Sequence, residues 1–270
     1  MRWINRRPGP ALAAALAILP FALVLVAYMA GSEARRAVNP DDRILPAPAQ
    51  VAATAERLAT EPDRRSGVVL LWRDTAASLR RLTLGVGLAA GIGLALGLAI
   101  GLIPMVRAGL SGFVAAASMV PPLAVLPILF IVLGLGETSK VALIAVGVAP
   151  FLVRELAQRT LELPPEQMVK AQTLGASTSA IALRVALPQI MPRLVGAVRL
   201  SLGPAWLFLI AGEAIASDSG LGYRIFLVRR YLAMDVILVY VAWITLLAFL
   251  LDAALRLASR RLYPWAGASL

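Results

Sequence analysis

Long apolar runs without any charged residue constrain this chain more than any other feature. Two of them cover 82–106 and 110–135, and each exceeds the roughly 20 residues that a helix needs to cross the hydrocarbon core of a bilayer. The chain is 60% hydrophobic and only 15% charged, so its charges gather between such runs. The pattern predicts an all-α polytopic membrane protein with about six transmembrane helices.

The predicted spans divide the chain into four regions. The spans are 10–29, 82–106, 110–135, 141–153, 194–216 and 235–257. The regions are an N-terminal arm with the first span (1–31), a loop with interfacial amphipathic helices (32–81), a five-helix core (82–260) that includes the polar stretch 157–193, and a tail (261–270). A cleaved signal peptide is the alternative for the first run, but its length favours a retained span.

Arginines flank the predicted bundle at both ends of the chain. They are Arg2, Arg6, Arg7, Arg260 and Arg261. Because Lys and Arg gather on the cytoplasmic side of membrane proteins, we expect both ends of the chain and the stretch 157–193 inside, with 32–81 and 217–234 outside. Contacts with the lipid bilayer then account for the net charge of +11, and no nucleic-acid partner is expected.

The chain contains neither Cys nor His. This excludes disulfide bonds, thiol catalysis, Ser-His-Asp triads and His or Cys metal sites, so we expect no catalytic residue and no metal site. A G-x-x-x-x-G-K-[ST] phosphate loop is also absent from the sequence. We therefore expect a protein that performs no covalent chemistry itself.

Two amphipathic stretches lie in the loop 32–81. The first, 49–58, is expected to form a short helix on the membrane surface. The second, 71–82, leads into the next span, and its arginines are expected at the level of the lipid headgroups. These arginines are Arg73, Arg80 and Arg81.

Glycines and prolines mark the next two runs. Glycines spaced four apart, at Gly93-Gly97-Gly101 and Gly87-Gly91, predict close helix–helix packing. In the run 110–135, three prolines free backbone groups that only protein or water can satisfy inside a membrane. They are Pro121, Pro122 and Pro127. The prolines therefore indicate either a pathway-lining helix or an ordinary kinked span.

The polar stretch between the fourth and fifth spans has the signals of a helical hairpin. Pro164 and Pro165 begin a helix, Gly175 ends it in the left-handed conformation, and Ser177 caps a second helix over 178–186. Pro188 is expected to end that second helix. The hairpin is too polar to span the membrane, and it is either a docking element or a solvated loop.

This hairpin resembles the cytoplasmic coupling loop of ABC importer permeases, whose pattern is E-A-A, three residues, G, and a later I-x-L-P-like end. The matching residues are Ala171, Gly175, Ala176, Ser177, Leu187 and Pro188. Val169 stands where the pattern has Glu, and Lys170 replaces the first Ala. Glu166, one turn earlier, is then the acid expected to contact the ATPase.

Further motifs resemble permeases of the nitrate/sulfonate/taurine type over about residues 40–260. They are Leu45-Pro46-Ala47-Pro48, Pro121-Pro122-Leu123-Ala124-Val125-Leu126-Pro127, Gly203-Pro204-Ala205-Trp206, Ala211-Gly212-Glu213 and Ser219-Gly220-Leu221-Gly222-Tyr223. The resemblance implies a bacterial inner-membrane permease that works as a homodimer, with two ATP-binding subunits and a periplasmic binding protein. ATP and Mg would bind the partner ATPase.

Candidate pathway residues outside the proline motif are Trp206, Glu213 and Ser217. Glu213 is an isolated acid within the fifth span, so it is either a substrate contact or a structural partner of the backbone or Trp206. The runs 170–175 and 223–232 resemble a subgroup of permeases linked to urea or guanidine carboxylases, which implies a guanidine-like substrate. Sulfonate, taurine or nitrate remain alternatives for the substrate. An ion-coupled secondary transporter or channel remains the alternative class, but no inverted repeat supports it.

Overall fold

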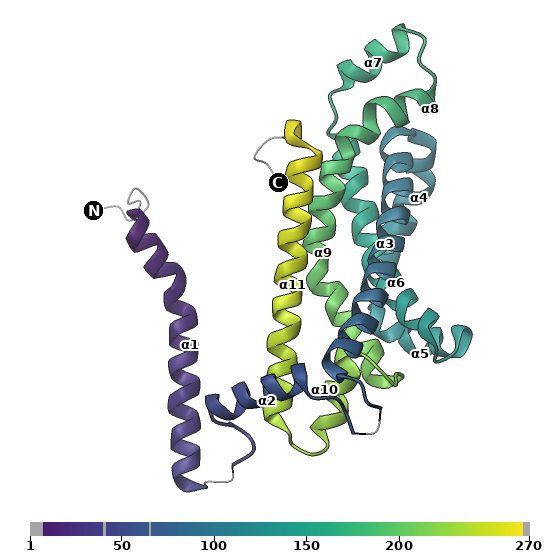
Figure 1. Cartoon of the computed structure of the whole chain (residues 1–270). Helices are drawn as coiled ribbons and strands as arrows, with labels where there is room; N and C mark the ends of the chain where they lie inside the picture. Colours follow the sequence, from purple (N-terminus) through teal and green to yellow (C-terminus); the bar gives the residue numbers. More distant parts are fainter. Residues whose placement is uncertain (1–7, 40–41, 65, 267–270) are drawn as a thin grey trace.

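The computed structural model describes residues 8–39, 42–64 and 66–266, and every regular element among them is helical. Arg2, Arg6, Arg7 and the last four residues of the predicted tail lie outside the described residues. The helices, shown in Figure 1, are α1 (Pro10–Val38), α2 (Pro48–Thr60), α3 (Leu70–Leu102), α4 (Pro104–Ala117), α5 (Pro122–Leu133), α6 (Glu137–Leu161), α7 (Pro165–Thr173), α8 (Thr178–Ile181), α9 (Leu187–Ile215), α10 (Leu221–Arg229) and α11 (Met234–Leu262). The prediction of an all-α polytopic fold is confirmed.

Five helical segments are long and apolar enough to cross a membrane, and a bent pair makes a possible sixth. The five are α1, α3, α6, the continuous segment 178–215 and α11. The hairpin of α7 and α8 lies at the same end of the bundle as the C-terminal end of α11, and we call this the hairpin end. α2 and α10 lie at the opposite end, which we call the α10 end (Figure 1).

Glycines set the packing of α3 on α6. A Cβ atom built on Gly93 would lie 2.6 Å from the Cβ of Leu152, and one on Gly97 would lie 2.7 Å from that of Leu156. The offset is constant, because 152 − 93 and 156 − 97 both equal 59. The two helices therefore run parallel and touch through the predicted glycine face. Gly87 and Gly91 have nothing within 4 Å, so this second pair packs on no other part of the described chain.

Because α3 and α6 run parallel, the chain between them must return to the α10 end. α4 and α5 make this return, and they are bent by 96° relative to each other. The predicted run 110–135 is therefore interrupted by a sharp break, and it counts as one span when α4 and α5 are taken together. α4 ends at Ala117 and α5 begins at Pro122, because two consecutive prolines remove backbone donors and disfavour helical geometry in the residue before them.

The stretch 71–82 leads into the next span without a break, as predicted. It forms the first turns of α3, which continues unbroken to Leu102. Arg73 and Arg80 are exposed, but Arg81 is only 2% exposed, so its side chain is enclosed by protein. Carboxylates from other helices compensate its charge, which permits the burial.

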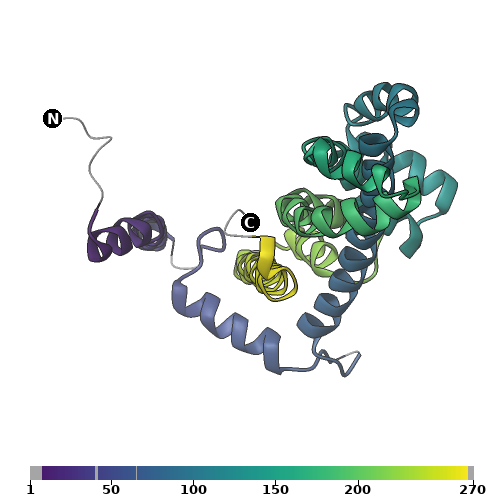
Figure 2. The same cartoon turned by 90° about the horizontal axis from the view of Figure 1, so that it is seen from above.

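The first helix stands apart from the bundle. Figure 2 shows α1 separated from α3 and α11, with α2 lying between them. None of the most apolar window of α1 is buried within the chain. Among the described residues, the side-chain hydrogen bonds of α1 to other parts of the chain reach the following loop, where Tyr28 Oη donates to Pro46 O at 2.6 Å and Ser32 Oγ donates to Leu45 O at 3.0 Å. α2 forms the predicted short helix near 49–58.

Candidate functional site: a coupling hairpin and a broken span

Local capping signals build the hairpin as the sequence predicts. α7 begins at Pro165, and Gly175 has a φ of +79°, which favours glycine. The backbone N–H of Ala176 donates to Ala171 O at 3.0 Å, and that of Gly175 donates to Gln172 O at 2.9 Å. This pair of bonds is a Schellman motif, which fixes the turn between the two helices.

The second helix of the hairpin is capped by Ser177, whose Oγ accepts a hydrogen bond from Ala180 N at 3.2 Å. Contrary to the prediction, Pro188 does not end this helix. α8 passes through a π-helical turn, Ala182–Ala186, directly into α9. Pro188 lies in the first turn of α9, where a missing N–H is tolerated. The hairpin is therefore continuous with a membrane-spanning helix.

The hairpin carries an exposed surface of mixed character. No residue of α7 is buried, and both Glu166 and Lys170 are exposed. Val169 and Leu174 are 57% and 79% exposed, so apolar area lies beside these charges. A side-chain bond from Gln189 Nε2 to Gln167 Oε1 at 2.9 Å ties α7 to α9. The surface is thus rigidly attached and free to contact another protein.

The connection from α6 to the hairpin is charged. Gln158 and Arg159 both hydrogen-bond the carboxylate of Glu162, and these bonds lower its pKa below the usual range. Arg159 also pairs with Glu155 at 2.8 Å. The residue that follows α6 therefore stays ionised at neutral pH, at the foot of the hairpin.

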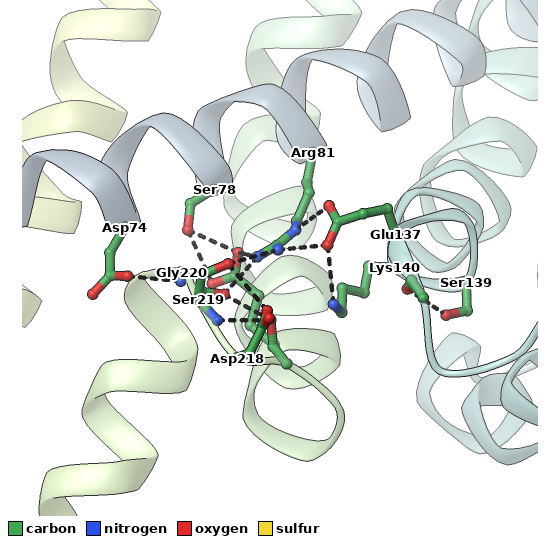
Figure 3. A network of polar contacts seen from close by, with 12 residues as sticks. Asp74, Ser78, Arg81, Glu137, Ser139, Lys140, Asp218, Ser219 and Gly220 are labelled. Atoms are coloured by element: carbon green, nitrogen blue, oxygen red, sulfur yellow. Dashed lines mark hydrogen bonds and ion pairs between the residues drawn. The ribbon is translucent and has the colours of Figure 1, made fainter. Parts of the chain in front are cut away.

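At the α10 end, Arg81 joins three parts of the fold. Its guanidinium contacts Glu137 at 2.6 Å, Glu213 at 2.7 Å and the carbonyl of Ser219 at 2.7 Å (Figure 3). Glu213 is fully buried and also accepts hydrogen bonds from Ser78 Oγ at 2.8 Å and from Gly222 N at 2.9 Å. The isolated acid expected from the sequence is thus one member of a buried network.

The same network holds the loop between α9 and α10. Asp74, buried on α3, accepts a bond from Gly220 N at 3.1 Å and pairs with Arg224 at 2.8 Å. Gly220 has a φ of +120°, a conformation that side chains rarely adopt. Ser217 Oγ donates to Ser219 O at 2.6 Å within this loop. Asp74, Ser78 and Arg81 share one face of α3 at helical spacing, and this signal could have revealed the network.

The candidate pathway residues do not form one cluster. Glu213 and Ser217 belong to the network at the α10 end, whereas Trp206 is 4% exposed in the core and its Nε1 has no hydrogen-bond partner among the described residues. Trp206 is therefore not the partner of Glu213. Pro121 and Pro122 lie at the α4–α5 break, and Pro127 lies inside α5.

A cavity of about 650 Å³ opens at this break. Pro122 and Ser118 line it from the broken span, Pro150 and Arg154 from α6, and Phe208 from α9. Arg154 Nη1 donates to Ser118 Oγ at 3.0 Å, so the cavity contains a cation that the sequence did not single out. In the part of the chain that the structure describes, no group of three or more acidic residues is arranged to hold a metal ion.

The parallel α3–α6 pair, the broken span and the exposed helical hairpin define a polytopic membrane transport subunit. The family model of the binding-protein-dependent transport system inner membrane component matches residues 87–264. The chain belongs to this family and is a multi-pass component of the bacterial inner membrane. It is the permease subunit of an ABC importer and not an enzyme, since ATP hydrolysis resides in a separate subunit.

Similar proteins agree with the assignment to ABC importer permeases. The taurine transport system permease protein of Escherichia coli is 39% identical over 198 residues, which cover 73% of this chain and 72% of that protein. The nitrate import permease protein of Synechococcus elongatus is 28% identical over 210 residues, covering 77% of this chain and 75% of that protein. An inward-facing structure of the MetNI methionine ABC transporter has a chain with the same fold, at a TM-score of 0.63 and 23% identity, covering 71% of this chain and 95% of that one.

Proposed function

We propose that this permease forms the translocation pathway for a small polar solute and that its hairpin receives the force of ATP hydrolysis. The observation that supports this most strongly is the continuity of α8, through a π-helical turn, with α9. Force applied to the exposed hairpin would act on a membrane-spanning helix without an intervening flexible loop. Such rigid transmission is what alternating access requires.

The ATP-binding subunit would dock on the hairpin surface. Its contact residues are Glu166, Lys170, Ala171, Gly175, Ala176, Ser177, Leu187 and Pro188. ATP and Mg would bind that partner, and the hairpin end would be cytoplasmic. Val169 offers apolar area where the family pattern has Glu, so Glu166 would supply the acidic contact instead.

Two copies of the chain would enclose the pathway, with two ATP-binding subunits below and a periplasmic binding protein at the α10 end. Exposed apolar side chains on α5 support this arrangement, because Ile131 and Val132 are 84% and 71% exposed. The cavity at the α4–α5 break is open in a single copy and would be completed by the second one. The core 82–260 would carry this pathway, with 157–193 as its coupling loop and 1–81 as a peripheral region.

Candidate solutes follow from two sources. Relatives are named for taurine and nitrate transport, which favours small anions or zwitterions. The guanidine-like alternative depends only on the runs 170–175 and 223–232. Within the proposed pathway, Pro122 would line the cavity, with Pro121 beside it at the break and Pro127 inside α5. Trp206, Glu213 and Ser217 would support the pathway from the core and the α10 end.

A tagged form of the chain, purified with its ATP-binding subunit and reconstituted in liposomes, tests the proposal. We expect an ATPase to co-purify and its hydrolysis rate to rise with the loaded binding protein. Gly175→Val forces a β-branched side chain into the left-handed region and should weaken this stimulation at least about tenfold. Gly9→Val, at a glycine with open space around it, is the control. Undiminished stimulation in Gly175→Val would contradict coupling through the hairpin.

A further inference from the structure

The cavity at the α4–α5 break contains a cation without a carboxylate partner. Among the described residues, Arg154 forms no ion pair, and its only hydrogen bond runs to Ser118 Oγ. The neighbouring acid of the cavity, Glu155, is engaged by Arg159 at 2.8 Å. Most N–H groups of the Arg154 guanidinium are therefore available to a ligand.

The position of Arg154 in the fold bears on its lack of an ion pair among the described residues. Arg154 lies 161 − 154 = 7 residues before the end of α6, which is about 10 Å along the helix axis. It is exposed, and it lines the cavity together with Ser118. The unpaired guanidinium is therefore accessible from the cavity.

The local geometry holds the guanidinium toward the cavity. Ser118 caps the end of α4, and its hydroxyl donates to Ala115 O at 2.8 Å while it accepts from Arg154. The proton of Ser118 and one of its lone pairs thus have defined roles at the break. The bend of the span, by ending α4 at this point, brings Ser118 to α6.

A second cavity continues the positive charge toward the hairpin end. It has a volume of about 310 Å³ and shares Glu155 with the first cavity. Three arginines line it against two acids, and these residues are Arg159, Arg193, Arg199, Glu155 and Asp252. Asp252 pairs with Arg199 at 2.7 Å and Glu155 pairs with Arg159 at 2.8 Å, so Arg193 has no acid within the cavity lining and acts on Glu162 outside it.

We propose that the cavity at the α4–α5 break is an anion-binding subsite of the translocation pathway, in which Arg154 contacts a sulfonate, nitrate or similar oxyanion and Ser118 orients Arg154. The inference rests on the proposed permease function and names its substrate class. The planar guanidinium fork matches oxyanions bidentately, which a lysine cannot do. A guanidinium cation would instead be repelled by Arg154 at this point.

Thiol labelling tests the subsite even while the transported solute is unidentified. The chain contains no Cys, so Ala117→Cys places a single thiol beside Ser118 on the cavity wall. The full complex in liposomes is treated separately with 2-sulfonatoethyl methanethiosulfonate, an anion, and 2-(trimethylammonium)ethyl methanethiosulfonate, a cation. The measured quantity is the ratio of the two labelling rates.

We expect the sulfonate reagent to be favoured and Arg154→Gln to lower the ratio about tenfold. Arg154→Lys keeps the charge and should retain most of the ratio. Arg260→Gln, which removes an exposed charge near the end of α11, is the matched control and should leave the ratio unchanged. A complex that still contains its ATPase shows that a variant is folded.

A labelling-rate ratio that is unchanged in Arg154→Gln would overturn the anion subsite. Failure of both reagents to label the thiol would also overturn it, because the cavity would then be closed to water. The permease proposal fails separately, when no ATPase co-purifies with the unaltered chain. In that case an Arg154-dependent ratio would still support an anion site.

Discussion

Arg81 and Arg154 are both arginines within long apolar helices, but the fold treats them in opposite ways. Arg81 is buried and bonded to Glu137 and Glu213 from two other helices, whereas Arg154 is exposed to a cavity and, among the described residues, bonded only to a serine. Removing one partner of a compensated buried ion pair is strongly destabilising, because it leaves an uncompensated buried charge. An uncompensated charge at a cavity remains available for a ligand, so the comparison separates a structural arginine from a functional one.

The largest expected effect comes from removing the compensated charge. Arg81→Met leaves Glu213 buried without its cation, which should lower the free energy of unfolding by about 3–5 kcal/mol. The measurement is thermal unfolding of the purified chain in detergent. Arg80→Met, at the exposed neighbouring position, is the control.

The double variant Arg81→Met with Glu213→Gln sharpens this prediction. It removes both buried charges, so it should recover part of the stability lost in Arg81→Met. If the double variant were less stable than Arg81→Met, the ion pair would not be what holds α3 to α9.

A smaller effect is expected where α3 touches α6. Gly97→Ala places a Cβ 2.7 Å from that of Leu156 and should cost about 1–3 kcal/mol of unfolding free energy. Gly91→Ala, on the open face of the same helix, should be neutral or stabilising by up to about 1 kcal/mol. Equal losses in both variants would mean that close approach to α6 is not the cause.

The smallest expected effect is at the hairpin cap. Ser177→Ala removes the bond to Ala180 N and should destabilise α8 locally by about 1 kcal/mol. Hydrogen exchange of the hairpin amides measures this change, with Thr178→Ala as the neighbouring control. Protection that is the same in both variants would show that the cap does not hold the hairpin.

The elements that the sequence predicted correctly depend on neighbours in the chain. Proline at a helix start, glycine at a helix end and the serine cap together specify the hairpin within 15 residues, 164–178. The exposed helix α2 likewise follows from its own amphipathic pattern. Within the hairpin, only the predicted helix end at Pro188 was wrong, because α8 continues through a π-helical turn into α9.

The elements that the sequence did not predict depend on distant partners. Arg81 and Glu213 are 132 residues apart, and neither position alone shows that the other compensates it. The prolines predicted an interruption of the run 110–135 but not its 96° angle, since the parallel packing of α3 and α6 sets where the chain must return. From the apolar run 141–153, Arg154 was expected just outside a short span. In the structure α6 continues for eight residues beyond Val153, so Arg154 lies within the helix.

Uptake into liposomes by the complex of this chain with its ATP-binding subunit and binding protein tests the central claim most directly. The substrate is radiolabelled taurine or nitrate, and uptake is compared with ATP inside the liposomes and with an ion gradient alone. The account predicts uptake of an anionic or zwitterionic solute that requires ATP and is lost in Gly175→Val. Uptake driven by the ion gradient without ATP would contradict it.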